Sequence, residues 1–562
     1  MASRSLIRFV VACAVVLALF AGVTPAFAQA WKFGVMSDTQ WIGNDDGKNP
    51  NTVAVVIVEA INREFIKNGV TFVIQVGDLV SDGSVTGYDT RANYAQALYN
   101  AGIGFFPLRG NHDAALHSSV EFKHVFPQTQ NGLMNMTPAD ARAATTDYGP
   151  PPTSTRKPFT IGSGFSSPAA ASTTTGLIGL SYAFTFKNAR FVLLDQFTRV
   201  DGTGRGTPNM NNVNIAEQQP WIDHALADRP AGSHAFVLGH KNLIGEGHID
   251  NLLGASPAAN APARNVFIGS LQRHGVRLYV SGHDHVHDRS IIQSPDAHSS
   301  VQQIIGASDS SKFYVPAVPS PDVKYDDPPR ETPLAQEMNR VGYYIYTVDG
   351  PLVTVDYYSA PVNPTFDQPA GEYLITTTPT LVFEKRESFG YSLNGKEFVV
   401  AEGASYTSVQ QTFGSTTARI LSGTNSSTAV DFSKRPFSKA VDTGWTAAPV
   451  NGPLASDILT LWGMARSLGS PETDVYTLSV TYGAAKAPAG GLGNGTFGLA
   501  TRRADGTWGN AVDANLGGTK RFVAGAWNAS YGLGTYGVDP ATHTAWAVVN
   551  YNAQFGVASG IK

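Results

Sequence analysis

The sequence predicts an α/β layered domain followed by an all-β domain of the sandwich type. From Trp31 to about Ala360, short apolar strands alternate with amphipathic helices, which is the pattern of a layered α/β domain. From about Gly371 onward, helical periodicity is scarce and strand-like alternation replaces it. The length of 562 residues exceeds one ordinary core, and 57 glycines and 33 prolines favour strands and turns over long helices. These observations predict two domains, at 29–365 and 371–562.

The first 28 residues have the pattern of a signal peptide. Arg4 and Arg8 give a positive start, and an apolar run follows from Phe9 to Val23. Ala26-Phe27-Ala28 then fits the small-x-small rule for cleavage before Gln29. The apolar run is shorter than the ~20 residues that a membrane span needs, which disfavours the alternative of an anchor. We therefore expect 1–28 to be removed and the protein to be exported to the periplasm or the medium.

Export changes what the cysteine and the charge imply. Cys13 is the only cysteine and lies in the segment to be removed, so the mature chain has no thiol and relies on packing and metal for stability. The loss of Arg4 and Arg8 takes the formal net charge from −4 to −6. There is no basic stripe, which argues against a dedicated nucleic-acid binder, and no later stretch qualifies as a membrane span.

Within 29–365 the apolar periodicity predicts each element in turn. Strands are expected at 33–36, 72–76, 103–108, 190–194, 235–238 and 277–280. Helices are expected at 53–66, 91–100 and 217–227. The stretch 127–180 is rich in Pro, Ser, Thr, Ala and Gly, and it is either an insertion that rims the active site or a passive surface excursion.

The stretch 371–562 has the signals of a β domain. Tyr476, Leu478, Val480 and Tyr482 alternate with other residues, as in a half-buried strand. Asn394-Gly395 and Asp505-Gly506 each lie between strand-like flanks and predict hairpins. The stretch contains one histidine and no candidate site.

Polar side chains follow five of the apolar strands, each at the carboxyl end. They are Asp38, Asp78, Asn111 with His112, His240, and His283 with His285. Ligands bind at this edge of open α/β sheets, so we expect these side chains to lie close together. Glycines beside them allow the chain to turn sharply and bring backbone and ligand together.

Carboxylates combined with imidazoles suit Mn, Zn or Fe. Two such ions about 3.5–4 Å apart can hold the attacking and leaving oxygens of a displacement at phosphorus. Each motif alone has an ordinary alternative, since Gly-Asn-His marks turns, histidine pairs occur on surfaces and Asp78 could cap a helix. The series, in this order and always after a strand, favours a metal centre. Other histidines are assigned ordinary surface or core positions: His117, His124, His224, His234, His274 and His298.

This series resembles the calcineurin-like metallophosphoesterase superfamily over residues 31 to about 360. The resemblance is carried by Asp38-Thr39-Gln40, Gly77-Asp78, Gly110-Asn111-His112-Asp113, Gly239-His240 and Gly282-His283-Asp284-His285. Residues 190–195 are similar to the middle strand of the family, and 218–226 to the helix before its metal-binding histidine. Residues 282–289 are similar to the Gly-His-x-His-x-Tyr-Glu-Arg run of the purple acid phosphatase branch.

The resemblance implies two divalent or mixed-valence transition-metal ions and the metal-dependent hydrolysis of small phosphate monoesters or diesters by a metal-bridging hydroxide. The implied ligands are Asp38, Gln40 and His285 for the first ion, Asp78 bridging both, and Asn111, His240 and His283 for the second. His112 would donate a proton to the leaving group or stabilise the transition state. Asp113 would orient His112 through a hydrogen bond.

Two positions depart from the family pattern. The family usually has His at the position of Gln40, and a neutral amide oxygen is a weaker ligand for a transition metal. The purple acid phosphatases have a metal-bound Tyr where this chain has Ser81, so ferric-tyrosinate chemistry is not expected. Residues beside the motifs are weaker candidates: Arg109 and Lys241 for phosphate contact, and Asp82, His248 and His287 for support of the ligands.

A second class of function is a metal-binding, non-catalytic binding or adhesion protein whose β-sandwich domain holds a partner. Gln40 and the size of the β domain motivate this alternative, which rests on fold-level analogy. The sequence does not indicate an oligomeric state, a metal identity or a choice between monoester and diester.

Overall fold

The computed structural model describes residues 29–42, 47–114, 118–129, 165–166, 177–198, 215–254, 256, 258–316, 330–367, 372–426, 438–488 and 490–561. The predicted signal peptide lies outside these residues. Of the predicted insertion at 127–180, only 127–129, 165–166 and 177–180 are described. Among the described helices, none has the length and apolar character needed to cross a membrane.

The first sheet of the N-terminal domain has six strands, in the order β17, β14, β13, β1, β2, β3. Their bounds are Glu384–Ser392, Leu352–Pro361, Arg340–Asp349, Trp31–Met36, Phe72–Val76 and Gly104–Leu108. β1, β2 and β3 are parallel, whereas β13 joins β1 in the antiparallel sense. The three parallel strands therefore end at one edge.

The second sheet has eight strands, in the order β12, β9, β10, β8, β7, β6, β5, β4. Their bounds are Glu331–Glu337, His287–Gln293, Ser300–Ile305, Leu278–Ser281, His234–Gly239, Ala189–Leu194, Tyr182–Phe186 and Phe165–Ser166. β6, β7 and β8 are parallel, and the strands on either flank add antiparallel pairs. A small third sheet joins β11 (Lys312–Phe313), β16 (Glu372–Leu374) and β15 (Thr365–Asp367).

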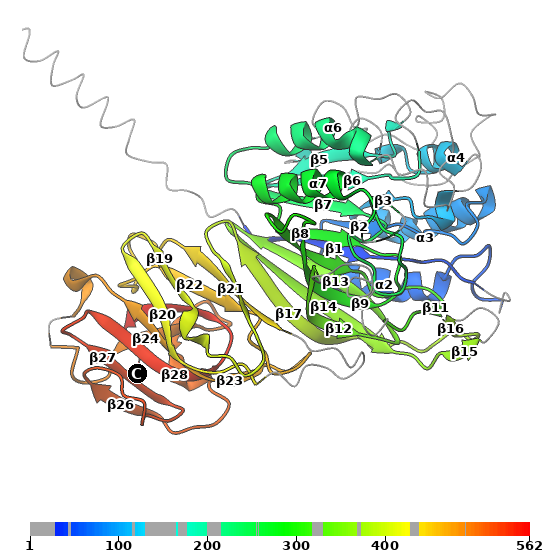
Figure 1. Cartoon of the computed structure of the whole chain (residues 1–562). Helices are drawn as coiled ribbons and strands as arrows, with labels where there is room; N and C mark the ends of the chain where they lie inside the picture. The colour runs from blue at the N-terminus through cyan, green and yellow to red at the C-terminus, as the bar shows by residue number, and fades with distance from the viewer. Residues whose placement is uncertain are drawn as a thin grey trace, which may run out of the picture.

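The two larger sheets pack face to face, with helices on both outer faces (Figure 1). The inner layer is aromatic, and Phe33 of β1 stacks on Tyr346 of β13 and meets Phe236 of β7 edge-on. α2 (Val55–Asn68) and α3 (Val85–Asn100) cover the first sheet, and α6 (Ile215–Ala227) and α7 (Ala261–Arg273) cover the second. A shorter helix, α4 (Ser118–Val125), packs against α3. The predicted α/β layered domain is confirmed as helices, sheet, sheet and helices.

The helices differ from their predicted bounds in an instructive way. α3 begins at Val85, six residues before the predicted start, because Ser84 caps it by accepting a hydrogen bond from the Gly87 N–H at 3.1 Å. α7 was not predicted, although Phe267, Ile268 and Leu271 face the core, because its apolar residues are few and its Pro262 suggests a loop.

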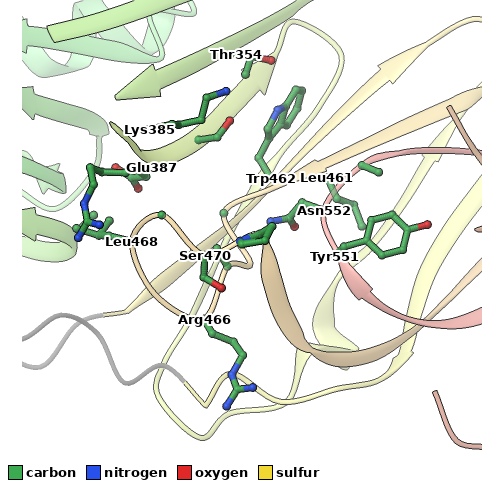
Figure 2. A pocket seen from close by; sticks show the side chains of 18 of the residues that line it. Thr354, Lys385, Glu387, Leu461, Trp462, Arg466, Leu468, Ser470, Tyr551 and Asn552 are labelled. Atoms are coloured by element: carbon green, nitrogen blue, oxygen red, sulfur yellow. The ribbon is translucent and has the colours of Figure 1, made fainter. Parts of the chain in front are cut away.

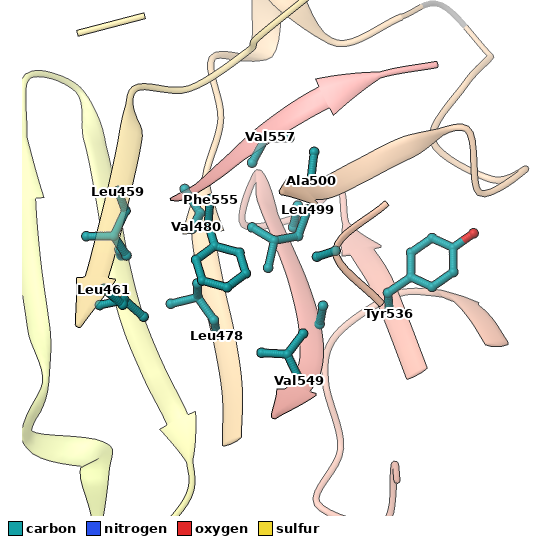
Figure 3. Packing of buried hydrophobic residues seen from close by; sticks show 14 of the residues in the cluster. Leu459, Leu461, Leu478, Val480, Leu499, Ala500, Tyr536, Val549, Phe555 and Val557 are labelled. Atoms are coloured by element: carbon teal, nitrogen blue, oxygen red, sulfur yellow. The ribbon is translucent and has the colours of Figure 1, made fainter. Parts of the chain in front are cut away.

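The C-terminal domain is a sandwich of two six-stranded sheets. One sheet contains β18 (Glu397–Val400), β21 (Lys439–Thr446), β22 (Ile458–Trp462), β29 (Gln554–Ser559), β24 (Phe497–Arg502) and β25 (Trp508–Asn510). The other contains β19 (Gln410–Phe413), β20 (Thr416–Ser422), β23 (Glu472–Thr481), β28 (Thr544–Tyr551), β27 (Thr535–Asp539) and β26 (Arg521–Ala524). Aliphatic and aromatic side chains from both sheets interleave in the core, as Figure 3 shows for Leu478, Phe555 and Val557.

The N-terminal domain ends later in the chain than the predicted boundary at 365–371. β17 pairs with β14, with Phe389 opposite Val355, so the N-terminal sheet extends to Ser392. The hairpin predicted at Asn394-Gly395 is wrong, because β17 and β18 belong to different sheets. An Asn-Gly pair indicates a turn, but it does not show that the two flanking strands pair with each other. Here the turn connects the two domains. The hairpin at Asp505-Gly506 is confirmed, since β24 and β25 pair across it.

Candidate metal centre

The loops that follow the parallel strands meet at one edge of the N-terminal domain. The Asp38 N–H donates to the Gly77 carbonyl at 3.2 Å and the Thr39 N–H to the Asp78 carbonyl at 2.8 Å, which joins the ends of β1 and β2. The Gly282 N–H donates to the His240 carbonyl at 2.9 Å, which joins the ends of β7 and β8. The predicted convergence of strand ends therefore holds for both sheets.

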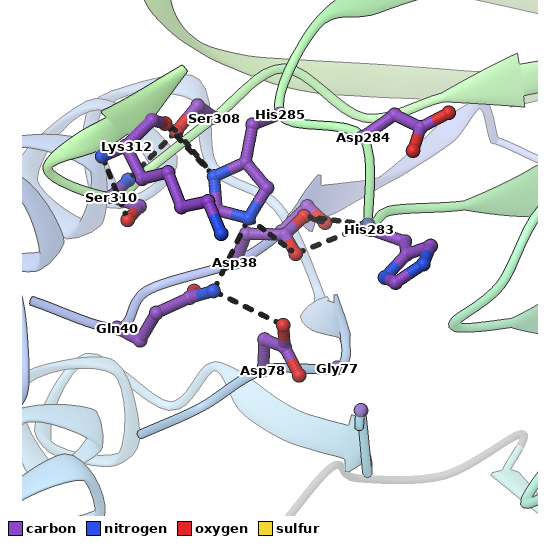
Figure 4. A network of polar contacts seen from close by, with 12 residues as sticks. Asp38, Gln40, Gly77, Asp78, His283, Asp284, His285, Ser308, Ser310 and Lys312 are labelled. Atoms are coloured by element: carbon purple, nitrogen blue, oxygen red, sulfur yellow. Dashed lines mark hydrogen bonds and ion pairs between the residues drawn. The ribbon is translucent and has the colours of Figure 1, made fainter. Parts of the chain in front are cut away.

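Asp38, Asp78 and His285 form one buried group whose potential ligand atoms lie within 4.8 Å of one another (Figure 4). His285 Nε2 lies 3.5 Å from Asp38 Oδ1. Gln40 joins them, because its Nε2 donates to Asp78 Oδ2 at 3.0 Å and lies 3.2 Å from His285 Nε2. The Nδ1 of His285 lies 2.8 Å from the Lys312 carbonyl, which fixes Nδ1 as the donor and leaves Nε2 with a lone pair.

Asp78 also belongs to a second group, with Asn111 and His240. His240 Nε2 lies 2.9 Å from Asn111 Oδ1 and 3.4 Å from Asp78 Oδ1. The Nδ1 of His240 lies 2.9 Å from the Val76 carbonyl, so the backbone of β2 holds the ring with Nε2 toward the carboxylate. Asp78 thus lies between two sets of metal-type ligands, as predicted for a bridging residue.

His283 lies beside the second group. Its ring centroid is 5.1 Å from that of His240, and its backbone N–H donates to both oxygens of Asp38 at 3.1 and 3.2 Å. Its Nε2 lies 3.4 Å from Asp250 Oδ1. His283 is therefore close to the centre, with its ring nitrogen directed at a carboxylate that the sequence did not single out.

His112 and Asp113 lie at the same edge, but their predicted link is corrected. The Asp113 carboxylate accepts backbone N–H groups from Gly110 at 2.8 Å, Leu79 at 3.0 Å and Val80 at 3.3 Å. The Nδ1 of His112 instead lies 2.8 Å from the Ser81 carbonyl. Asp113 is fully buried and its carboxylate binds the backbone, whereas His112 is half-buried.

Four residues of the centre have a backbone conformation that is uncommon for residues other than glycine. Asp38, Asp78, His283 and His285 have φ of 48°, 47°, 74° and 51°. A non-glycine residue in this left-handed region costs of order 1–3 kcal/mol, and such strain concentrates at functional sites. Gly110 is required by close approach, since a Cβ there would lie 2.0 Å from Asp78 Oδ1. The folded chain holds these conformations through the surrounding sheets.

The electrostatics of the centre favour a cation. Burial raises the pKa of the Asp38 carboxyl to about 7, with His240 opposing the shift and the carboxylate of Asp78 adding to it. Burial alone would raise the pKa of Asp78 too, but His240 and His112 hold it below its usual range. Burial lowers the pKa values of His283 and His285 well below the usual value, so both imidazoles are neutral, as metal ligands must be.

The amide of Gln40 provides a direct test of whether a metal fits. In the part of the chain that the structure describes, its buried Oε1 has no hydrogen-bond partner, while its Nε2 lies between Asp78 and His285. A half-turn of the amide exchanges the two atoms and presents the oxygen to these ligands. An oxygen, two carboxylates and an imidazole form a donor set suited to a divalent transition metal. The residues therefore fit the group that the sequence predicts.

Three of the weaker candidates make contacts outside the metal centre. Arg109 is buried and engages Asp195 at 2.7 Å and Thr198 at 2.7 Å, so it braces the fold. His287 lies between Tyr344 and Glu387, away from the metal ligands. Asp82 is exposed, and its Oδ1 accepts the Ser84 N–H at the start of α3.

Lys241 and His248 do lie beside the centre. The Lys241 ammonium contacts Asp250, the residue beside His283. The His248 ring stacks on His283 with centroids 4.2 Å apart, and its Nδ1 lies 2.7 Å from Asp284 Oδ1. His248, His283 and Asp284 also form a group of potential ligands.

Sequence reasoning missed Asp250 and Tyr314. Asp250 follows no strand, so the rule that located the other ligands could not find it. Tyr314 lies edge-on to His248 at 4.5 Å and to His285 at 5.5 Å, and it donates to Glu372 at 3.1 Å. It follows β11, a two-residue strand too short to leave a periodic signal.

The family model for calcineurin-like phosphoesterases matches residues 32–287, the part of the chain that contains the candidate metal ligands. A comparison with curated proteins gave no match.

Similar solved structures include GAP50, described as the anchor in the inner membrane complex of Plasmodium, at 13% identity and a TM-score of 0.34 over 59% of this chain and 84% of that one. Purple acid phosphatase PPD1 from yellow lupin (Lupinus luteus) seeds is 13% identical, with a TM-score of 0.36 over 65% of this chain and 54% of that one. A dimetal phosphatase from Danio rerio is 15% identical, with a TM-score of 0.34 over 58% and 95%.

Proposed function

We propose that the protein is an exported, two-metal phosphoesterase that hydrolyses small phosphate esters. The observation that carries the proposal is the position of Asp78, whose two oxygens face two different sets of ligands. Oδ2 accepts from Gln40, beside His285, and Oδ1 lies 3.4 Å from His240. A carboxylate shared in this way is the natural bridge of a two-metal site.

Asp38, Gln40 and His285 would hold one ion, Asn111, His240 and His283 the other, and Asp78 both. Such ions, when bound, polarise the phosphoryl group and make water acidic enough to attack near neutral pH. The chain supplies neutral imidazoles and buried carboxylates for this purpose.

His112 is the group that handles the proton. Its backbone N–H donates to Asp78 Oδ1 at 2.9 Å, which ties the residue to the bridging carboxylate. Because Nδ1 donates to the Ser81 carbonyl, Nε2 is the remaining ring nitrogen, and in the imidazolium form of the ring it can donate a proton to the leaving oxygen.

Export is proposed from the sequence of residues 1–28 and from the lack of any cysteine after Cys13. Sequencing of the secreted product should find Gln29 as its first residue. A cell-retained protein with an intact N-terminus would exclude export.

The decisive experiment replaces Asp78 with Asn. This variant should remain folded by circular dichroism, lose bound metal by elemental analysis and turn over neither p-nitrophenyl phosphate nor its bis-ester with Mn, Zn or Fe. Asp82→Asn is the matched control, because Asp82 is exposed and outside the ligand groups. Undiminished turnover in the Asp78 variant would sink the proposal. A wild-type protein that is folded, metal-poor and inactive would favour the non-catalytic binding role.

A further inference from the structure

A cavity of about 730 Å³ lies between the two domains, apart from the metal centre. One wall comes from the N-terminal domain and the other from the sandwich, as Figure 2 shows for Lys385 of β17 and Trp462 of β22. Leu352 of β14 also lines the first wall and Lys439 of β21 the second. The described lining includes none of the predicted metal ligands. Its volume is that of a small-molecule site.

Part of the wall is apolar and held rigidly. Trp462 is only 6% exposed, and a Cβ on Gly390 of β17 would lie 2.5 Å from its ring, so the indole packs directly on the backbone of the other domain. Leu461 and Tyr551 extend this surface on the sandwich side. An aromatic and aliphatic wall of this kind binds the apolar body of a ligand.

Most cations that line the cavity already have anionic partners. Lys385 pairs with Asp356 at 2.8 Å and Arg386 with Glu337 at 2.8 Å. Arg289 pairs with Glu387 at 2.7 Å. These pairs are structural and leave little capacity for a ligand.

Lys439 is different. The residue is 7% exposed, and its Nζ is buried without a hydrogen-bond partner among the described residues. Burial lowers the pKa of its ammonium to about 8, with Asp474 opposing the shift, so the group is still charged at neutral pH. Because a buried charge without a partner is costly, this arrangement calls for an anion.

We propose that the interdomain cavity binds a small amphipathic anion, with its acidic head on Lys439 and its apolar body on the Trp462 wall. The head could be a carboxylate, a sulfonate or a phosphate, because each of these groups is an anion that can pair with the ammonium. The site would tie the two domains together through a bound molecule, independently of the reaction at the metal centre.

The test uses the full chain and two fluorescent probes of the same shape. 8-Anilinonaphthalene-1-sulfonate carries the acidic head, and N-phenyl-1-naphthylamine lacks it. Energy transfer from tryptophan should report binding of both. Lys439→Met should weaken the anionic probe at least about tenfold and leave the neutral probe within about threefold. Lys396→Met, at an exposed lysine before β18, is the matched control and should change neither.

A second measurement separates a ligand site from a structural role. Without a probe, Lys439→Met should keep or raise the melting temperature, because it removes a buried charge that has no partner. Lys439→Arg should retain the preference for the anionic probe.

Equal binding of the anionic probe by wild type and Lys439→Met would overturn the proposal, as would a melting temperature several degrees lower in Lys439→Met. Hydrolysis of p-nitrophenyl phosphate should be unchanged in Lys439→Met, so failure here leaves the phosphoesterase proposal standing.

Discussion

At the scale of single residues, His112 and Asp113 have different roles in the proposed reaction. Adjacent residues in one motif have different tasks, because the His112 ring contacts the Ser81 carbonyl while the Asp113 carboxylate binds the backbone. Asp113 holds three backbone N–H groups in place and thereby the loops that carry Asp78 and Asn111. In the proposed reaction, Asp113 would therefore act through the position of the ligands.

Replacement of His112 by Gln should lower kcat by roughly 10²–10⁴-fold, the contribution typical of a positioned acid. Metal content should not change, because the link to Asp78 is through the His112 backbone. The loss should be larger with phenyl phosphate than with p-nitrophenyl phosphate, since the poorer leaving group needs the proton more. An equal loss on both substrates would contradict the acid role.

Gln40 is the residue at which metal affinity can be tuned. Gln40→His should bind the first ion at least tenfold more tightly, or about 1.4 kcal/mol, because imidazole is the stronger ligand. Gln40→Ala should bind it more weakly. Competition with a chelator, followed by elemental analysis, measures both. Unchanged affinity in both variants would remove Gln40 from the ligand set.

At the scale of elements, the ends of β1, β2 and β3 and of β7 and β8 build the centre. The β3 turn leaves no room for a side chain at Gly110, because Asp78 occupies the space. This packing couples the geometry of one strand end to that of the next.

Gly110→Ala should therefore cost about 1–3 kcal/mol of folding free energy by overpacking and should also reduce bound metal. Urea unfolding and elemental analysis measure the two effects. Gly493→Ala is the control, because a Cβ there meets nothing within 4 Å. A Gly110 variant with normal stability and metal content would show that the loop adapts freely.

At the scale of the whole molecule, the place of β17 decides where the domains can be separated. Phe389 and Tyr391 of β17 are 1% and 3% exposed and belong to the core between the N-terminal sheets. The interdomain cavity and Trp462 lie just beyond this strand. The two domains are therefore adjacent through β17.

A chain of residues 29–395 should fold and retain partial activity on p-nitrophenyl phosphate, whereas 29–370 should aggregate. The shorter chain loses two buried aromatic side chains, each worth about 1.5–3 kcal/mol, and exposes the edge of β14. Thermal melts and light scattering compare them. Equal stability of the two chains would show that β17 contributes nothing to the N-terminal domain.

The sequence by itself determined the layered class, the parallel strands and the polar residues at their ends. These features are local, because the apolar periodicity of a strand and the polar residues that follow it lie within a few residues of one another. The same holds for the hairpin at Asp505-Gly506, whose two strands are close in the chain.

Only the tertiary structure decided which side chains meet. The Asn394-Gly395 turn could not reveal that its flanks enter different sheets, and nothing near Asp250 or Tyr314 in sequence places them beside His283 and His285. The roles of His112 and Asp113, and a lysine buried without an anion, likewise depend on what other strands bring near. Such contacts arise from long-range packing, which local patterns do not encode.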